Sequence, residues 1–462
     1  MTEILTITAP SELRATPQLP ASKSISNRAL VISALACRGD ADCHGMLYDT
    51  ARLPENLSDC DDTKTLLQAL AMLDGRSGKA DVVIDIGAAG TAMRFLTALL
   101  ATSEGSFLLT GTERMKRRPI GILVEALQQL GADIRYEGEE GFPPLRISGR
   151  QLDGGIVEMQ GSVSSQYISA LLMLAPVLHN GLELRLKGDI VSRPYIDLTL
   201  WMMREFGAEA SWTSGNVITV RPSGYQHRPY LIENDWSAAS YWYEMVALTA
   251  DEDAEIRLPG LHDSSKQGDA AVRYIFSMLG VKTEVSRSVE RGTRSEEGGT
   301  RSEERGVRSV EGEVRSEKGG TIVLRKSDRV APRLDYDFVN SPDLVQTVVV
   351  TCAAKGIPFH FRGLQSLRIK ETDRIDALVR ELRKAGFVLR VENADELVWD
   401  GERCEPSLEP IDTYEDHRMA LSFAPLALRF PKISIRHPQV VTKSYPHFWD
   451  SLRSAQFIVS SE

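Results

Sequence analysis

A helix that ends in glycine and leads directly into a strand recurs along this chain. The pattern is present in ILVEALQQLGADIRY, LTLWMMREFGAEASW, AVRYIFSMLGVKTEV and DALVRELRKAGFVLR, whose glycines are Gly131, Gly207, Gly280 and Gly386. Glycine is favoured after the last helical turn because it adopts the left-handed conformation without steric cost. A unit that recurs in this way predicts an α/β fold built from copies of one supersecondary motif.

The spacing of these glycines is nearly constant once one segment is set aside. Residues 286–320, a run rich in Arg, Ser, Glu and Gly, separate the third glycine from the fourth. Without that run the glycines lie about 71 to 76 residues apart. LLQALAML before Asp74 and HFWDSLRSAQFIV near the C-terminus resemble two further copies. We therefore predict about six units, in two domains of three units each, with a ligand cleft between the domains.

The segment 286–320 has a repeat of its own, in which arginine recurs every seven residues. A heptad coiled coil is one interpretation, but glycines interrupt the segment and it has no apolar seam. We expect a polar hairpin extension without a catalytic role, because the segment has almost nothing to bury.

The composition predicts a folded protein whose ligands are small. A net charge of −10 and a pI near 5.5 disfavour a nucleic-acid surface. The longest apolar run, YISALLMLAPVL, is too short to cross a bilayer, and MTEILTITAP does not resemble a secretory signal, so we expect a cytoplasmic protein. The five cysteines are scattered without a CxxC pair, which argues against a disulfide framework and against a metal site.

Hydroxyl and basic side chains gather at several predicted helix starts in the first half. ASKSISNR, GAAGTAMR, GSVSSQ and SRPYID each lead into an apolar helical run, and ERMKRRPIG adds four basic residues before a proline. The free N–H groups and the dipole at a helix N-terminus favour an anion. Ordinary capping would explain any one of these stretches, but it does not readily explain so many. They indicate a cleft that binds small anions.

The second half places acids beside bases. Asp343 lies in SPD, the stretch RIKETDRIDAL contains Lys370, Glu371 and Arg374 at a predicted helix start, and Arg418 lies in EDHRMAL. Lys370 and Arg374 are four residues apart and would share one side of that helix. The alternative is that these residues form surface charge pairs. A similar Asp-His-Arg start before another apolar run weakens this alternative.

Together, and in this order over nearly the whole chain, these stretches resemble the EPSP synthases, the 3-phosphoshikimate 1-carboxyvinyltransferases. The resemblance rests on LPASKSISNRAL, GAAGTAMR, ERMKRRPIG, GSVSSQ, SRPYID, QGD, IKETDRI, DHRMA and TKSYPHF. It implies transfer of the enolpyruvyl group of phosphoenolpyruvate to the 5-hydroxyl of shikimate 3-phosphate, with release of phosphate and without a metal or organic cofactor. This is a step of chorismate and aromatic amino acid biosynthesis.

The resemblance also implies the enolpyruvyl transferase fold, an inside-out α/β barrel of two globular domains, each with three βαβαββ units. Residues 20–232 would form the domain on the shikimate phosphate side, and residues 1–19 with 233–462 the domain on the phosphoenolpyruvate side. The chain would cross between them near Pro20 and Glu233. We expect a monomer that binds two small molecules and neither nucleic acid nor membrane.

Residue by residue, the resemblance implies two binding sites and a catalytic set. The expected contacts of shikimate 3-phosphate are Lys23, Ser24, Arg28, Ser164, Ser165, Gln166, Ser192, Tyr195, Asp343 and Lys370. Those of phosphoenolpyruvate are Lys23, Gly90, Arg118, Gln166, Arg374, Arg418 and Lys443. Asp343 is the expected base for the hydroxyl and Glu371 the acid and base at the methylene carbon, with Lys443 and Lys23 assisting.

The chain departs from the family pattern at Ala21, Ala88, Phe95, Trp236 and Ser366, where Gly, Asn, Pro, a small residue and Asn are usual in that order. No charged catalytic residue is lost at these positions. Two alternatives stay open. One is the UDP-N-acetylglucosamine enolpyruvyl transferase branch of the same fold, which typically uses a loop cysteine, and the other is a non-enzymatic anion-binding module.

Overall fold

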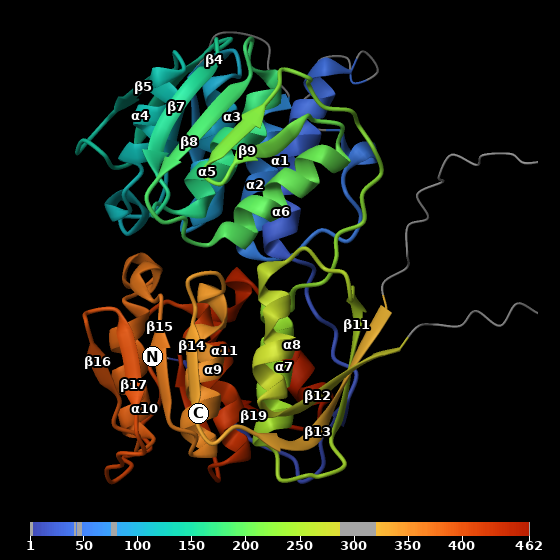
Figure 1. Cartoon of the computed structure of the whole chain (residues 1–462), viewed down its shortest axis with the longest axis vertical. Helices are drawn as coiled ribbons and strands as arrows, with labels where there is room; N and C mark the ends of the chain where they lie inside the picture. Colours follow the sequence, from blue (N-terminus) through green and yellow to red (C-terminus); the bar gives the residue numbers. More distant parts are fainter. Residues whose placement is uncertain (1–2, 41–42, 44–48, 75–80, 287–319, 462) are drawn as a thin grey trace, which may run out of the picture.

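The chain folds into two bodies stacked along the long axis of the molecule (Figure 1). The computed structural model describes residues 3–40, 43, 49–74, 81–286 and 320–461. The heptad-repeat segment therefore lies outside the described residues, apart from Ser286 and Gly320 at its two ends.

Each body contains six of the described helices. The upper body contains α1 (Lys23–Gly39), α2 (Asp61–Asp74), α3 (Gly90–Ala101), α4 (Gly121–Gln129), α5 (Ser165–Leu174) and α6 (Arg193–Glu205). The lower body contains α7 (Trp236–Leu248), α8 (Val272–Ser277), α9 (Val345–Lys355), α10 (Arg374–Lys384), α11 (His417–Phe423) and α12 (Phe448–Ser454).

Four four-stranded sheets share one topology, in which a parallel pair is followed by two antiparallel neighbours. In the upper body their strands, in spatial order, are β3 (Val82–Asp85), β4 (Gly105–Thr110), β6 (Leu145–Gly149) and β5 (Asp133–Tyr136), and then β7 (Gly155–Gln160), β8 (Leu182–Lys187), β10 (Val217–Val220) and β9 (Ala210–Ser214). In the lower body they are β2 (Arg14–Ala15), β11 (Glu255–Leu261), β13 (Gly320–Val330) and β12 (Leu279–Ser286), and then β14 (Leu334–Asp337), β15 (Phe359–Arg362), β17 (Glu396–Trp399) and β16 (Arg390–Glu392).

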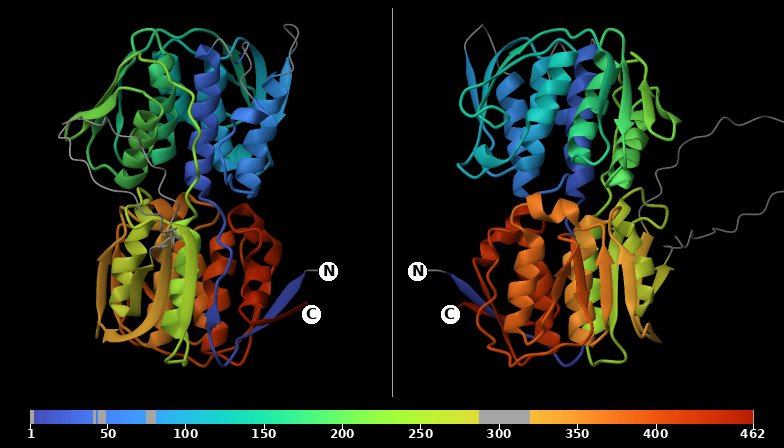
Figure 2. Two further views of the ribbon diagram at one scale, coloured as in Figure 1. Left: turned by 90° about the vertical axis from the view of Figure 1, so that its right-hand side faces the viewer. Right: turned by 60° about the vertical axis from the view of Figure 1, so that its left-hand side comes forward.

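A fifth sheet joins the two ends of the chain. Strand β1 (Ile4–Thr8) lies between β18 (Ile433–Arg436) and β19 (Ile458–Ser461) and is antiparallel to both. A parallel bridge between Ile411 and Ile435 gives this sheet the same topology as the other four. Figure 2 accordingly shows both termini on the same side of the lower body. The prediction of an α/β fold made from a repeated unit is confirmed.

The four repeat glycines adopt the predicted left-handed conformation. Their φ angles are 97° at Gly131, 84° at Gly207, 87° at Gly280 and 88° at Gly386. Gln456, after α12, takes the same conformation with φ 66°. The last copy of the unit thus makes its turn without glycine, at a steric cost that an L-residue ordinarily avoids.

Two segments connect the bodies and pair with each other where they cross. Ala21 and Asn234 form an antiparallel bridge, in which the Ser22 N–H donates to the Glu233 carbonyl at 2.9 Å and the Asp235 N–H donates to the Pro20 carbonyl at 2.9 Å. One hydrophobic core contains Leu5 to Leu19 together with residues from Trp236 onward, and the other runs from Ala21 to Ile232. Each connection therefore leaves one core and enters the other within a few residues.

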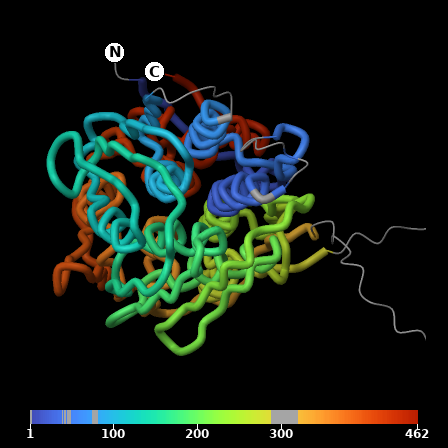
Figure 3. The backbone as a smooth tube through the Cα atoms, turned by 90° about the horizontal axis from the view of Figure 1, so that it is seen from above, coloured from blue at the N-terminus to red at the C-terminus, as the bar shows by residue number. Residues whose placement is uncertain are grey.

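The helices of the upper body run along the long axis and toward the lower body. Viewed from above, the blue and cyan helices appear nearly end-on (Figure 3). Several helix N-termini consequently meet the region between the bodies, where they concentrate partial positive charge.

Candidate active site

A cavity of about 210 Å³ lies between the two bodies and is lined by side chains from both. The predicted site residues converge on it. Its lining includes Lys23, Ser24, Arg28, Gly90, Arg118, Ser164, Ser165, Gln166, Ser192, Tyr195, Asp343, Lys370, Glu371, Arg374 and Arg418. Lys443 is not part of the lining, but its amino group lies 3.0 Å from Glu371 Oε1.

Six helices begin at this cavity. They are α1, α3, α5 and α6 from the upper body and α10 and α11 from the lower body, and the first turn of each contributes a lining residue. Ser22, Ser164, Asp373 and Asp416 cap four of them by accepting backbone N–H groups. The remaining free N–H groups and the converging dipoles make the cavity attractive to anions, although the whole chain is acidic.

Arg28 is a buried cation held by neutral oxygen atoms. Its guanidinium donates to Thr199 Oγ1 at 2.7 Å, to the Ser24 carbonyl at 2.9 Å and to Ser169 Oγ at 3.0 Å. Burial lowers the pKa of Arg28 to about 10, which reflects the cost of a charge that no adjacent carboxylate offsets. A bound anion would supply the missing charge.

Gly90 allows two further guanidinium groups to approach the helix start of α3. A Cβ atom at this position would lie 2.5 Å from Arg118 Nη1 and 3.0 Å from Arg94 Nη1, so any side chain would displace one of them. Arg94 is buried, and its Nε has no partner among the described residues. Burial, together with the neighbouring Arg118, lowers the pKa of Arg94 to about 10. Arg94 and Arg118 thus form a second group of cations whose positive charge the described carboxylates do not fully balance.

Asp343 lies among three cations of the lower body. Its Oδ1 is 3.2 Å from Arg374 Nη1 and 3.7 Å from Lys370 Nζ, and its Oδ2 is 3.0 Å from Arg418 Nη2. Burial by itself raises the pKa of Asp343, but these cations, Arg418 most strongly, hold that pKa well below its usual value. Asp343 is therefore an ionised carboxylate at neutral pH.

Glu371 lies at the boundary between the two bodies. Its Oε1 is 3.0 Å from Lys443 Nζ and 4.0 Å from Arg118 Nη1, and its Oε2 is 3.0 Å from Arg374 Nη2. Burial raises the pKa of Glu371, but the same three cations outweigh burial and hold it well below its usual value.

The predicted helix start at Lys370 is wrong by a few residues. Helix α10 begins at Arg374, because Asp373 caps it by accepting the N–H groups of Ile375 and Asp376. Lys370 and Glu371 lie in the turn that precedes the helix. They reach Asp343 and Lys443 from that turn rather than from one side of a helix.

Some residues at the cavity were not predicted as site residues, among them three charged or titratable residues of the lining, Asp62, Arg94 and His417, and Asp269, which lies beside the lining residue Tyr195. Arg94, described above, lies in GAAGTAMR, one of the helix starts that the sequence indicates as favourable to an anion. Asp62 forms an ion pair with Lys23 at 3.8 Å. Burial lowers the pKa of Lys23, but Asp62, Cys60 and Glu371 together outweigh burial, so this pKa is raised. His417 is buried in the lining, and neither ring nitrogen is hydrogen-bonded to a described residue. Burial, with Lys23 next, holds the pKa of His417 well below 6.5. Asp269, from the QGD motif, contacts the Tyr195 hydroxyl.

The chain is similar to known proteins over nearly its whole length. The family model described as EPSP synthase (3-phosphoshikimate 1-carboxyvinyltransferase) matches residues 7–452. This chain belongs to the EPSP synthase family. It is 52% identical to the 3-phosphoshikimate 1-carboxyvinyltransferase of Bacteroides fragilis, over 98% of this chain and 97% of that protein. It is 34% identical to the protein of the same name from Photobacterium profundum, over 97% of this chain and 98% of that protein.

A solved EPSP synthase from Acinetobacter baumannii has the same fold as this family member. It aligns with a TM-score of 0.70 at 20% sequence identity, over 99% of this chain and 100% of that one. The predicted enolpyruvyl transferase fold is thereby confirmed. Among the residues that the structure describes, no helix is long and apolar enough to span a membrane, and no group of three or more His, Cys, Asp or Glu side chains could hold a metal ion.

Two departures of this EPSP synthase from the family pattern have a packing explanation. Phe95 is fully buried, and the guanidinium of Arg28 lies 5.6 Å from the centre of its ring, at cation–π distance. Trp236 is also fully buried, and its Nε1 donates to Glu233 Oε1 at 2.8 Å. Both aromatic side chains thus support segments that lead into the cavity.

The other three departures are smaller in effect. Ala88 is exposed, so its methyl group takes up no space in the cavity. Ala21 forms the bridge between the connecting segments, and Ser366 lines the cavity with a buried Oγ that has no hydrogen-bond partner in the described part of the chain. Ser366 therefore keeps a free polar group at a position where the family often has Asn.

Proposed function

We propose that this protein catalyses transfer of the enolpyruvyl group of phosphoenolpyruvate to the 5-hydroxyl of shikimate 3-phosphate. The observation that carries the proposal is the pairing of two partly buried acids, Asp343 and Glu371, with cations at one interdomain cavity. Two anionic substrates repel each other in water, and converging Arg and Lys side chains offset that repulsion within an enclosed site.

The shikimate 3-phosphate site is proposed to lie mainly on the upper body. Lys23, Ser24 and Arg28 begin α1, and the hydroxyls and amide of the starts of α5 and α6 face the same space. Arg28 has no carboxylate partner among the described residues, so a phosphate would supply its counter-charge. The proposed set is Lys23, Ser24, Arg28, Ser164, Ser165, Gln166, Ser192 and Tyr195, with Asp343 and Lys370 from the lower body.

The phosphoenolpyruvate site is proposed to lie between the two bodies, around Glu371. Arg118 comes from the upper body, whereas Arg374 and Lys443 come from the lower one, so the substrate would join the two. The proposed set is Lys23, Gly90, Arg118, Gln166, Arg374, Arg418 and Lys443.

The chemistry requires a base at the acceptor hydroxyl and an acid at the methylene carbon. Asp343, ionised in the free protein, would take the hydroxyl proton as that oxygen bonds to the central carbon of phosphoenolpyruvate. Glu371 would add a proton to the methylene carbon to give a tetrahedral intermediate. Asp343 would then give its proton to the departing phosphate, and Glu371 would take back a proton from the new methyl group, which completes the transfer.

Phosphoenolpyruvate would itself prepare Glu371 to act as an acid. In the free protein Lys443, Arg374 and Arg118 keep its pKa low. A bound carboxylate and phosphate would neutralise part of that positive charge, so the pKa of Glu371 would rise when the substrate binds. Glu371 could then hold the proton that the carbon receives, with Lys443 and Lys23 balancing the charge.

The nucleotide-sugar alternative finds less support. None of the five cysteines is among the residues that line the cavity. A phosphate-release assay with phosphoenolpyruvate separates the possibilities. Release with shikimate 3-phosphate alone is expected, and release with UDP-N-acetylglucosamine instead would favour the other branch. Release with neither acceptor would leave an anion-binding module. We further propose that the protein acts as a cytoplasmic monomer, which sedimentation and cell fractionation would test.

A further inference from the structure

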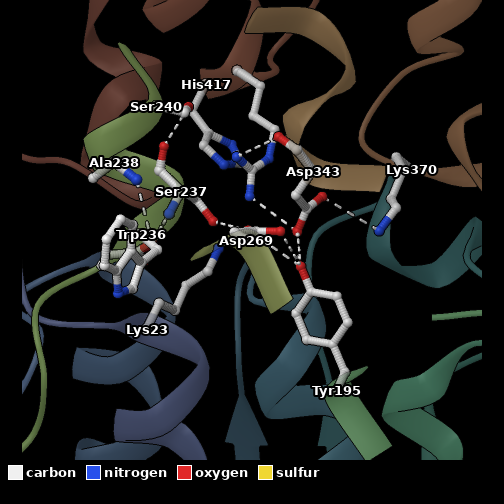
Figure 4. Close-up of polar contacts among 12 residues, drawn as sticks. Lys23, Tyr195, Trp236, Ser237, Ala238, Ser240, Asp269, Asp343, Lys370 and His417 are labelled. Carbon is white, nitrogen blue, oxygen red and sulfur yellow. Dashed lines mark hydrogen bonds and ion pairs between the residues drawn. The ribbon is translucent and has the colours of Figure 1, made fainter. Parts of the chain in front are cut away.

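Two carboxyl groups share the single hydroxyl of Tyr195, a residue that lines the cavity. The Tyr195 oxygen lies 3.2 Å from Asp343 Oδ2 and 3.3 Å from each carboxyl oxygen of Asp269. Figure 4 shows Tyr195 reaching from the upper body toward these two aspartates of the lower body. A phenol has one hydrogen to donate, so it can satisfy only one of the two acids. The contact between the Tyr195 oxygen and the other carboxyl group is favourable only if that carboxyl group carries a proton.

The surroundings of the two acids decide which of them carries the proton. Asp343 faces Lys370, Arg374 and Arg418, as described above. Asp269 is 4% exposed, and no ion pair within 4.0 Å is found for it among the described residues; its other hydrogen bond comes from the Ser237 hydroxyl. A buried carboxylate without an adjacent cation is strongly disfavoured, whereas one surrounded by three cations is not. The proton therefore belongs on Asp269.

We propose that Asp269 is a positioning residue that carries a proton and donates it in a hydrogen bond to the Tyr195 oxygen, so that Tyr195 donates its own hydrogen to Asp343. The Ser237 hydroxyl donates to Asp269 Oδ2, which fixes the direction in which these hydrogen bonds run. This series of hydrogen bonds orients Asp343, which acts as the base in the proposed function. The inference therefore rests on that proposed function. The proton on Asp269 also removes one negative charge from a site built for anions.

The pKa of Asp269 agrees with this geometry. Burial, with the neighbouring Asp343 next, raises the pKa of Asp269 to about 7, although Arg418 opposes the shift. The groups that face it are Tyr195 from α6, Ser237 from α7, Asp235 before α7, Asp343, and Arg418 from α11. When pH rises through this pKa, Asp269 loses its donor hydrogen and places a second negative charge beside Asp343.

Substitution of Asp269 gives a test with a conservative rescue. An amide can donate to Tyr195 as a protonated carboxyl does, so Asp269→Asn should keep kcat within about 10-fold of the wild type. Asp269→Ala removes the donor and should lower kcat about 100-fold, because the base is no longer held in position. Asp253→Asn, at an exposed turn of the same body, is the matched control. Equal loss in the Asn and Ala variants, or full activity in the Ala variant, would overturn the proposal.

Two further readouts separate this role from a purely structural one. In the wild type, kcat/KM for shikimate 3-phosphate should fall as pH rises through about 7, and this fall should be absent in Asp269→Asn, because kcat/KM reports groups of the free enzyme. Infrared spectra should contain a carboxylic acid band that disappears over the same pH range and is missing in Asp269→Asn. The fully buried Glu244 should contribute a second such band that stays unchanged. If the pH-dependent carboxylic acid band remains in Asp269→Asn, Asp269 is excluded as the proton carrier.

The assignment of Asp343 is tested separately. Asp343→Asn should abolish most of the turnover while leaving the infrared band of Asp269 in place. Normal turnover in that variant would remove the base from the proposed function, whereas the band would still decide whether Asp269 carries a proton.

Discussion

Lys443 and Glu371 form an ion pair at 3.0 Å, while Arg118 of the upper body lies 4.0 Å from the same Glu371 oxygen. The acid proposed for proton transfer thus lies between cations of both bodies, and its protonation state depends on what else those cations bind. A substrate that occupies the cations changes the acid strength of Glu371 without any movement of its side chain.

The substitution Glu371→Gln keeps the size of the side chain but cannot transfer a proton to carbon. We expect kcat to fall by about 10²- to 10⁴-fold, which is the usual contribution of one acid or base group. Both substrates should still bind, as calorimetry would measure. Glu113→Gln, at an exposed glutamate paired with Lys116, serves as the control. Near-normal turnover of Glu371→Gln would remove this residue from the mechanism.

Arg118 offers a test of the phosphoenolpyruvate site. Loss of a charge-assisted hydrogen bond costs about 1.5–3 kcal/mol, so Arg118→Ala should raise the KM for phosphoenolpyruvate by about 10- to 100-fold. The neighbouring Arg117 is exposed and lies outside the cavity lining, so Arg117→Ala is a closely matched control. Steady-state kinetics with phosphoenolpyruvate varied would reveal the difference, and an unchanged KM in Arg118→Ala would contradict the proposed site.

The segment between β12 and β13 should be dispensable. Ser286 and Thr321 are opposite each other in the antiparallel pair that flanks it, so a two-residue Asn-Gly turn in place of 287–320 can close the hairpin. We expect unchanged kcat and melting temperature. Loss of turnover at an unchanged melting temperature would show that the segment takes part in the reaction.

Glu244 should make the stability of the protein depend on pH. It is fully buried on α7, and burial raises its pKa well above 4.5 in the folded state, although Thr351 opposes the shift. Above about pH 4.5 the unfolded chain releases this proton and the folded one keeps it, so stability falls as pH rises, by up to about 1.4 kcal/mol per pH unit.

Glu244→Gln removes this titration, so it should stabilise the protein by an amount that grows with pH. Denaturant unfolding of both proteins at several pH values measures the effect. A difference that stays constant or shrinks as pH rises would mean that Glu244 is ionised in the folded protein.

Local sequence signals predicted much of the fold and of the candidate site. The glycine-ended helices predicted the repeated unit, because a left-handed turn after a helix is a local requirement that Gly131 and its three counterparts meet. Capping residues before apolar runs likewise placed Ser22 and Ser164 at helix starts that face the cavity. Near Lys370, however, the predicted helix start was too early, because the structure caps the helix with Asp373.

Asp269 and His417 could not be predicted in the same way. Each lies within a short motif whose side-chain directions depend on how distant elements pack. Asp269 acquires its role only because the crossing of the two bodies brings Tyr195, 74 residues earlier in the chain, to within 3.3 Å. The desolvation that shifts the pKa of both residues is likewise produced by tertiary packing and has no counterpart in local sequence.

The position of β1 between β18 and β19 has a consequence for how the protein is made. Strand β1 is translated long before its two partners, since β18 begins at Ile433 and β19 at Ile458. Residues 21–232, which form their own core, can fold while synthesis continues. The lower body has to wait until β18 and β19 are translated, and until then β1 remains an unpaired edge that a chaperone can protect.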